Sequence, residues 1–515
     1  MDYVDLKGWK EELSEFKEKT EEFYRGEINK GAYKGFSGRF GTYAQRSGTA
    51  HMLRLRMPAG RVTKERLAFT ADMIRKYHID RIHFTTCQTV QLHDLSKDSV
   101  YEIMEAALDA GIITIGGGGD YPRNVMCSPL SGVEKEEYFD VLPWAERASD
   151  YLIGFINAEK MPRKLKVGFS NSEKNEPHAT YRDLGFAARE DGKFDVYSAG
   201  GLGNNPLFGV KVAEAVEPQK ILYYIKAMWL TFCAYGNYEN RGRARTRYMQ
   251  EALGGEEEYR KAYLEKLEEV FASGEDLGVQ AEAEPVTKNG DGTSIEDVRV
   301  IAQKQDGLYT VAWHPIGGQP VPEQFCALSD ALAGMEATEL RLSPDETAYI
   351  INLTGAEAKK VLELTADSAK TQFEMSVSCI GGSICQVGLR DSQALLRACV
   401  DAVREAKIPG GALPQIHISG CPSSCGTHQT GRIGFRGASK PIDGKPQATF
   451  VLFINGNDRQ GSEEMGRELG MILETKIPEF LVELGKTVAG FGMDYETWLD
   501  KNPKGLEQLA EEYIL

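Results

Sequence analysis

Residues 376–385 read Ser-Val-Ser-Cys379-Ile-Gly-Gly-Ser-Ile-Cys385, and residues 419–429 read Ser-Gly-Cys421-Pro-Ser-Ser-Cys425-Gly-Thr-His-Gln. The two segments hold four of the nine cysteines of the chain, spaced as C-x5-C and then C-x3-C. Four thiolates that converge can ligate a cubane iron–sulfur cluster, because soft sulfur suits iron and closes its tetrahedral coordination. The neighbouring glycines let the backbone approach such a cluster and point amide N–H groups at its sulfurs.

Two other interpretations of these cysteines stay open at this point. A structural zinc site usually spaces paired cysteines by two to four residues, and the first pair here is wider. The four could also be buried side chains without chemistry, although two closely spaced pairs with Gly and Pro between them rarely arise from packing. Disulfides are not expected, because the N-terminus does not read as a secretion signal.

The composition indicates an ordinary folded protein. A chain of 515 residues, 42% hydrophobic and 26% charged, predicts two to four domains with ample cores. No apolar run reaches the roughly 18 residues needed to cross a bilayer. Residues 1–30 have a charged, amphipathic helical pattern rather than that of a signal peptide. We therefore expect a cytoplasmic protein that does not enter a membrane.

Charge is unevenly distributed along the chain. The net charge of −16 and the pI near 5.2 argue against nucleic acid as a partner, because phosphate binding needs a basic face. Basic residues nevertheless cluster in three places: Arg54/Arg56, Arg163/Lys164/Lys166 and Arg241/Arg243/Arg245/Arg247. A solvated basic face would explain any one of these clusters. Several of them in an acidic protein instead favour an anionic ligand.

The chain repeats itself. Residues 51–112 read strand, helix, strand, helix, with the second strand expected at 81–95, and residues 309–366 repeat this pattern with a strand at 339–353. The segments that follow each copy also correspond, and each is expected to end in a long helix, at 218–234 and 461–488. We therefore predict an ancient duplication, an α+β (mixed α/β) fold with pseudo-two-fold symmetry, and a central cleft that suits a cofactor.

The predicted domains follow from this duplication. Residues 1–47 form an N-terminal helix and arm, and residues 48–115 with 306–370 form one duplicated domain. Residues 116–252 and 371–515 form two further related domains, the second of which carries the four cysteines. Residues 253–305 are expected to be an acidic linker or surface excursion without chemistry of its own.

The spacing C-x5-C, followed at a distance by S-G-C-P-x-x-C-G, resembles the siroheme and [4Fe-4S] signature of the sulfite and nitrite reductase family. The resemblance covers nearly the whole chain. It implies a ferredoxin-like two-copy domain and two related domains that bind siroheme and the cluster. It also implies that Cys379, Cys385, Cys421 and Cys425 hold the cluster, and that the Cys425 thiolate bridges it to the siroheme iron.

The same resemblance implies a set of substrate-binding cations. The family's two arginines and two lysines map onto Arg54 in M-L-R-L-R, Arg123 in P-R-N-V, and Lys164 and Lys166 in P-R-K-x-K. Nitrite reductases of the family typically carry Asn at the position of Lys166, so the second lysine favours sulfite. The implied siroheme contacts are Thr85, Gln91, Arg163 and Arg245.

Two residues depart from the family pattern. Cys87 and His83 stand where relatives carry arginines, so two contacts to siroheme carboxylates are expected to be lost or moved, with Arg81 and Arg46 as replacements. Cys87 is then either an inert small residue or a reactive thiol beside the pocket.

The resemblance implies a cytoplasmic sulfite reductase that catalyses the six-electron reduction of sulfite to sulfide. Its electron donor is expected to be a separate ferredoxin or flavoprotein, because no flavin or nicotinamide fold is evident. One alternative is a siroheme nitrite reductase. A second, prompted by Cys87 and His83, is a redox sensor or scaffold that keeps the cluster without siroheme.

Overall fold

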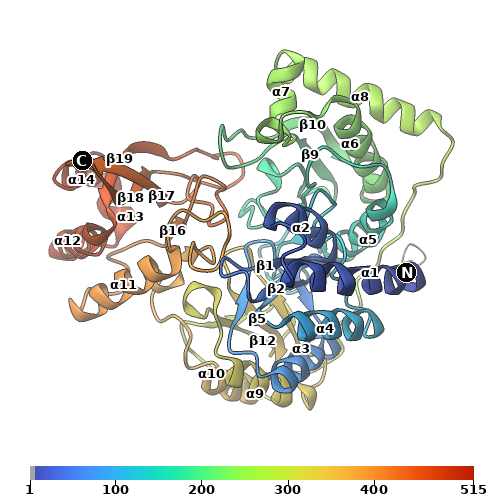
Figure 1. Ribbon diagram of the computed structural model, residues 1–515. Coiled ribbons are helices and arrows are strands. Elements are labelled where there is room, and N and C mark those ends of the chain that lie inside the picture. The colour runs from blue at the N-terminus through green and yellow to red at the C-terminus, as the bar shows by residue number, and fades with distance from the viewer. Residues whose placement is uncertain (1–5) are drawn as a thin grey trace.

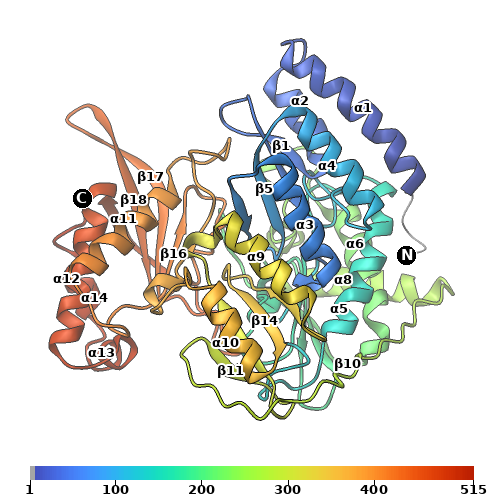
Figure 2. The same ribbon diagram turned by 90° about the horizontal axis from the view of Figure 1, so that it is seen from below.

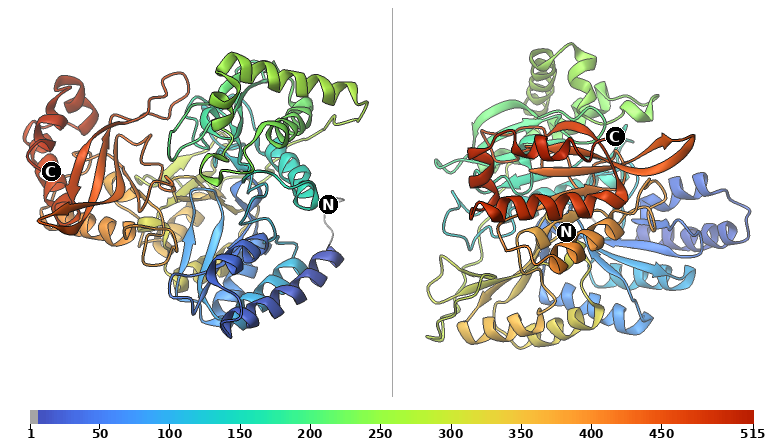
Figure 3. Two further views of the ribbon diagram at one scale, coloured as in Figure 1. Left: turned by 45° about the horizontal axis from the view of Figure 1, so that its top comes forward. Right: turned by 90° about the vertical axis from the view of Figure 1, so that its left-hand side faces the viewer.

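The computed structural model describes residues 6–515 as a mixed α/β protein built on four sheets (Figure 1). The last unit, from β15 onward, lies to one side of the ferredoxin-like pair, and residues 118–272 lie on another side (Figures 1 and 3). Among residues 6–515, no helix is long and apolar enough to cross a bilayer.

The first ferredoxin-like copy has an antiparallel sheet of order β1-β2-β5-β4. Its elements are β1 (Thr42–Ala44), β2 (His51–Leu55), α3 (Lys64–Tyr77), β4 (Ile82–Phe84), β5 (Val90–Leu95) and α4 (Lys97–Asp109). The helix α1 (Leu6–Tyr24) packs along α4 and buries Trp9, Leu13 and Phe16 (Figure 2). The amphipathic N-terminal helix predicted from the sequence is thereby confirmed.

The second copy repeats this arrangement and shares a core with the first. Its elements are β11 (Val300–Ala302), β12 (Tyr309–Trp313), α9 (Pro322–Ala333), β13 (Glu339–Leu342), β14 (Ala348–Leu353) and α10 (Gly355–Leu364). The short β3 (Arg61–Val62) of the first copy pairs antiparallel with β13 as the edge strand of the second copy's sheet, and so connects the two copies. Phe84 and Trp313, both fully buried, pack edge to face across the joint at 5.6 Å between ring centroids.

The two remaining sheets have the same topology, which supports the duplication. One has the order β10-β9-β8-β7-β6 and the other β15-β16-β17-β18-β19. In each, the first three strands along the chain are parallel and the last two are antiparallel. The first set is β6 (Met126–Cys127), β7 (Val167–Ser170), β8 (Leu184–Ala188), β9 (Phe194–Ser198) and β10 (Val210–Val216). The second is β15 (Val377–Ser378), β16 (Ile416–Ser419), β17 (Ile433–Ile442), β18 (Lys445–Ile454) and β19 (Arg467–Leu473).

The remaining helices pack on these two sheets or, in the case of α2, form part of the N-terminal arm. They are α2 (Lys30–Ser37), α5 (Leu142–Ile153), α6 (Ile221–Tyr235), α7 (Tyr248–Leu253), α8 (Glu256–Ala272), α11 (Ser392–Glu405), α12 (Ile477–Gly490), α13 (Tyr495–Lys501) and α14 (Gly505–Ala510). The helix α8 falls within the predicted linker but packs on α6 with Tyr259 and Tyr263 fully buried, so it belongs to the preceding domain. Residues 273–299 carry no helix or strand.

Two sequence-based predictions of elements were wrong. The expected strands at 81–95 and 339–353 are hairpins, β4–β5 and β13–β14, with tight turns at their centres. The helix expected at 461–488 begins only at Ile477, because residues 467–473 pair with β18 as an edge strand. Sheet pairing overrides local helical preference there.

Candidate active site in a cationic cavity

A cavity of about 1460 Å³ lies where the two ferredoxin-like copies meet the two larger sheets. All the site residues that the sequence singled out line this one cavity: Arg54, Thr85, Gln91, Arg123, Arg163, Lys164, Lys166, Arg245, Cys379, Cys385, Cys421 and Cys425. They come from segments that are far apart in the sequence. The structure therefore brings the predicted residues together, while their individual roles stay predictions.

The cysteine loops form one wall of the cavity. The backbone N–H of Gly420 donates to the Sγ of Cys379 at 3.2 Å, and the Ser392 hydroxyl lies 3.1 Å from the same sulfur. A Cβ on Gly426 would lie 2.1 Å from the carbonyl oxygen of Ile418, so only glycine fits beside Cys425. Cys425 is exposed and lines this cavity.

The charges of the cavity thiols and lysines affect one another's pKa. Burial raises the pKa of Cys379 to about 12, and the charge of Cys425 adds to this rise. Burial also raises the pKa of Cys425, which Lys164 opposes. Among residues 6–515, no three His, Cys, Asp or Glu side chains are arranged to hold a single metal ion.

Lys164 and Lys166 enter the cavity from the segment that leads into β7. Leu165 between them is 1% exposed and bonds through its backbone to residues 121 and 123, so the two lysines share the opposite face, as the alternation predicts. Burial lowers the pKa of Lys164 well below its ordinary value, and the positive charges of Lys166 and Arg245 lower it further. An anion between these lysines would offset the cost of keeping both protonated beside other cations.

Arg54 and Arg123 donate hydrogen bonds to the same backbone oxygen. Both guanidinium groups donate to the carbonyl of Gly117, and Arg123 also donates to that of Gly119 at 2.7 Å. Burial lowers the pKa of Arg123 to about 10, and its Nε has no hydrogen-bond partner. In the amide orientation that satisfies both of its ends, Gln91 accepts from Arg54 at 2.7 Å and donates to His93. These contacts hold the two arginines side by side.

Two predicted siroheme contacts carry their own carboxylate partners. Arg245 donates to both oxygens of Asp183 at 3.0 Å, and Asp183, fully buried, also accepts the backbone N–H of Lys166 at 2.8 Å. Arg163 pairs with Asp120 at 2.6 Å. Asp183 therefore positions Arg245 and Lys166 together.

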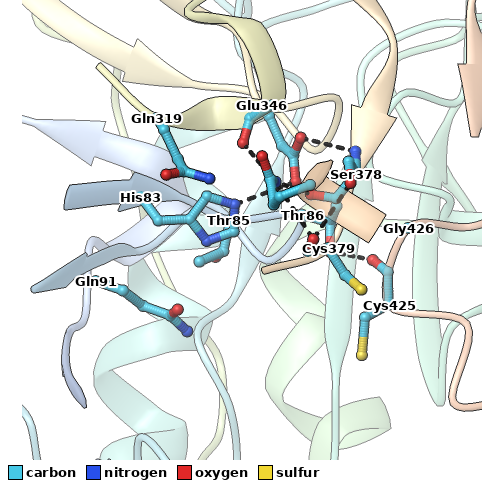
Figure 4. A network of polar contacts seen from close by, with 12 residues as sticks. His83, Thr85, Thr86, Gln91, Gln319, Glu346, Ser378, Cys379, Cys425 and Gly426 are labelled. Atoms are coloured by element: carbon cyan, nitrogen blue, oxygen red, sulfur yellow. Dashed lines mark hydrogen bonds and ion pairs between the residues drawn. The ribbon is translucent and has the colours of Figure 1, made fainter. Parts of the chain in front are cut away.

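The turn at residues 85–89 touches the cysteine wall. The Thr86 hydroxyl donates to the carbonyl of Cys425 at 2.8 Å (Figure 4). The Thr85 hydroxyl is occupied by Thr89 at 2.7 Å and accepts the N–H of Cys87, so its main contacts stabilise the turn. Burial raises the pKa of Cys87, but the charges of Lys166, Arg182 and Lys164 outweigh it and lower the pKa to about 6.

Arg182 is a cavity residue that sequence reasoning missed. It is 8% exposed, its Nε donates to the carbonyl of Pro177, and one of its terminal nitrogens has no partner. It directly precedes the segment Asp183-Leu-Gly-Phe186 that the duplication had aligned, which was the available signal. Of the two arginines predicted as replacements, Arg46 donates to the carbonyl of Cys385 at 3.1 Å, and Arg81 lies 3.7 Å from Asp94. A contact of either one with siroheme stays a prediction.

The residues present fit a polyanionic macrocycle next to a sulfur-ligated cluster. Buried cations with orphaned nitrogens surround the chamber, as a polycarboxylate and a small oxyanion require, and four thiols with close-packed glycines form one wall.

Comparisons with known proteins agree with this geometry. Residues 118–271 match the family described as "Nitrite and sulphite reductase 4Fe-4S domain", and residues 43–110 match the "Nitrite/Sulfite reductase ferredoxin-like half domain". The chain belongs to the nitrite and sulfite reductase family. Its cofactors are siroheme and a [4Fe-4S] cluster. Both matched ranges precede the cysteine loops, whose assignment to the cluster stays a prediction from their motif.

Relatives of this chain include both kinds of reductase. The sulfite reductase [NADPH] hemoprotein beta-component of Geobacillus kaustophilus is 26% identical over 488 residues, which cover 84% of this chain and 82% of that protein. The ferredoxin–nitrite reductase of Synechococcus elongatus is 26% identical over 423 residues, covering 79% and 80%. The solved structure of Mycobacterium tuberculosis NirA aligns with a TM-score of 0.74 at 22% identity, over 90% of this chain and 89% of that one, and so shows the same fold.

Proposed function

We propose that this protein is a sulfite reductase that reduces sulfite to sulfide by six electrons. The observation that carries the proposal is the pair of buried, cation-surrounded lysines, Lys164 and Lys166, in the cavity. A second lysine suits a doubly charged oxyanion better than a neutral side chain would, because cations offset the cost of desolvating the dianion.

The residues divide into two groups. Cys379, Cys385, Cys421 and Cys425 would hold the cluster, and Thr85, Gln91, Arg163 and Arg245 would hold the siroheme together with the Cys425 thiolate. When bound, these groups supply electrons and the iron at which the oxyanion is reduced.

The substrate-binding residues are Arg54, Arg123, Lys164 and Lys166. Arg54 and Arg123 orient the oxyanion through hydrogen bonds. Burial and neighbouring positive charges lower the pKa of both lysines, so they donate protons more readily than exposed lysines do. Each oxygen that the substrate loses as water consumes such protons. Asp183 holds the Lys166 backbone and keeps this strand in place.

Electrons would come from a separate ferredoxin or flavoprotein, in the cytoplasm, where free thiols and clusters persist. A second candidate function is nitrite reduction, which the ferredoxin–nitrite reductase relatives favour. The ratio of turnover with sulfite to turnover with nitrite decides between the two.

The test begins with the visible spectrum of freshly purified protein. We expect a Soret band and a chlorin-type red band from siroheme in addition to the broad absorption of the cluster. Cys379→Ala should lose iron and the cluster absorption, whereas Cys399→Ala, a buried cysteine outside the cavity, should keep both. A cluster spectrum without siroheme bands would instead support the sensor or scaffold alternative and refute the reductase.

A further inference from the structure

The duplication places two equivalent turns at the cavity, one in each ferredoxin-like copy. In the β4–β5 turn, Thr85 and Thr89 bond through their backbones and Gln88 bonds back to Thr85. The β13–β14 turn repeats these bonds with residues 343, 346 and 347. The equivalent residues Gln88 and Glu346 both have left-handed backbones, with φ of 53° and 71°. Such a conformation is uncommon outside glycine, and both turns hold it.

The two side chains differ in how well they are satisfied. Gln88 accepts the N–H of Cys127 at 2.9 Å and donates to the carbonyls of Cys127 and Leu342. Glu346 accepts the N–H of Ser378 at 3.0 Å, and Ser378 lies in β15, the strand equivalent to β6. The other carboxylate oxygen of Glu346 has no hydrogen-bond partner. In the first copy, an amide side chain is sufficient to accept the strand N–H. The second copy uses a carboxylate at the same position, which suggests a role for its charge or proton.

The free oxygen of Glu346 faces His83. The His83 Nε2 lies 3.4 Å from it, the Glu346 side chain is fully buried, and that of His83 is 4% exposed (Figure 4). Neither nitrogen of His83 has a hydrogen-bond partner. Both residues line the cavity, and Ser378, which Glu346 holds, directly precedes Cys379.

The surroundings make a shared proton favourable. Burial raises the pKa of Glu346, while His83 and the Ser378 N–H oppose the rise and Asp345 adds to it. On the far side of His83, the His93 ring lies 6.4 Å away between centroids, and Arg81 and Arg54 act on that ring. An acid and a base enclosed together carry one net negative charge without a shared proton and no net charge with it.

We propose that Glu346 and His83 form a proton-holding pair that is coupled to electron transfer at the cysteine loops. For each electron that a low-potential one-electron donor delivers to the cluster, the pair takes up one proton from solvent. Electron and proton leave together when the electron passes on to the oxyanion. A proton bound close by offsets the cost of placing negative charge in a low-dielectric interior. The proposal rests on the proposed assignment of the cluster to Cys379, Cys385, Cys421 and Cys425.

The test measures the midpoint potential of the cluster in the holoenzyme between about pH 6 and pH 9, by dye-mediated titration followed in the visible and by electron paramagnetic resonance. Wild-type protein should show a potential that falls with pH, approaching about 59 mV per pH unit where one proton accompanies one electron. Glu346→Gln should flatten the slope to less than about a third of this value, because the amide keeps the Ser378 contact, as Gln88 does at its own strand, but cannot bind a proton.

Two further variants separate coupling from structural loosening. Glu339→Gln changes a different buried glutamate, which lies in β13 and pairs with Arg61 at 2.7 Å. This control should leave the slope of potential against pH unchanged. His83→Gln removes the other half of the pair and should also flatten the slope, which keeps the proposal testable if Glu346→Gln does not fold. A flat wild-type slope, or a slope that survives both pair substitutions, would overturn the proposal. Protein purified without cluster absorption would refute the proposed function itself, and the pair with it.

Discussion

Lys166→Asn is the substitution that most directly tests substrate choice. Lys166 is buried against Cys87, Arg182 and Arg245, and it shares its cavity face with Lys164. The substitution removes one positive charge and one charge-assisted hydrogen bond from the oxyanion site. A planar neutral amide, which can still donate a hydrogen bond, takes its place.

The expected effect follows from the strength of such a bond. A hydrogen bond to a charged group is worth about 1.5–3 kcal/mol, and each 1.36 kcal/mol is a factor of ten, so kcat/KM for sulfite should fall about 10- to 150-fold. Nitrite carries one charge and costs less to desolvate, so a bond worth about 0.5–1.5 kcal/mol predicts a fall of only about 2- to 10-fold. The ratio of the two efficiencies should therefore move toward nitrite by about tenfold.

The assay uses reduced methyl viologen as the donor, so that no partner protein enters the comparison, and measures both substrates on the same preparation. Lys160→Asn is the matched control, since Lys160 lies on the exposed rim of the same cavity and its charge is screened. We expect the control to change neither efficiency by more than about twofold.

Two results would contradict this reasoning. An unchanged sulfite efficiency in Lys166→Asn would show that Lys166 does not contact the oxyanion. An equal loss with both substrates, at unchanged siroheme content, would show that Lys166 does not discriminate between them.

The remaining predictions concern the protein without its cofactors. The rate of Cys87 alkylation by iodoacetamide should be half-maximal near pH 6, because the thiolate forms as pH rises through the lowered pKa. Lys166→Met should move this midpoint to higher pH. A wild-type midpoint near the ordinary thiol pKa would contradict the structure. Sulfate at a hundred times its Kd should stabilise the apoprotein by about 2.7 kcal/mol and so raise its Tm. Lys164→Met should raise the Tm without any anion. Folding lowers the pKa of Lys164, so keeping this lysine protonated destabilises the folded protein. This destabilisation is complete below the folded-state pKa and disappears as pH rises to the ordinary lysine pKa. The gain in stability from Lys164→Met should therefore shrink toward about pH 10.

Local sequence predicted the elements well where pattern and packing agree. The N-terminal helix buries Trp9, Leu13 and Phe16 as its spacing indicates. Local sequence did not predict the hairpin turns. The segment Thr85-Thr86-Cys87-Gln88 contains neither glycine nor proline, and the left-handed Gln88 is stabilised by Cys127 from another domain. Local sequence failed again at residues 467–473, where pairing with β18 decides the conformation.

Local sequence indicated the chemistry of this protein in two places. The spacing of the four cysteines favoured a sulfur-ligated cluster over zinc or inert thiols, and the alternation about Leu165 placed Lys164 and Lys166 on one face, which the family resemblance then linked to an anion. The enclosure of these residues could not be read in that way. The lowered pKa of the lysines comes from burial by segments distant in sequence, and His83 meets Glu346 only in the folded chain, because the two residues belong to different ferredoxin-like copies. Desolvation and long-range pairing are properties of the folded chain, so no local pattern encodes them.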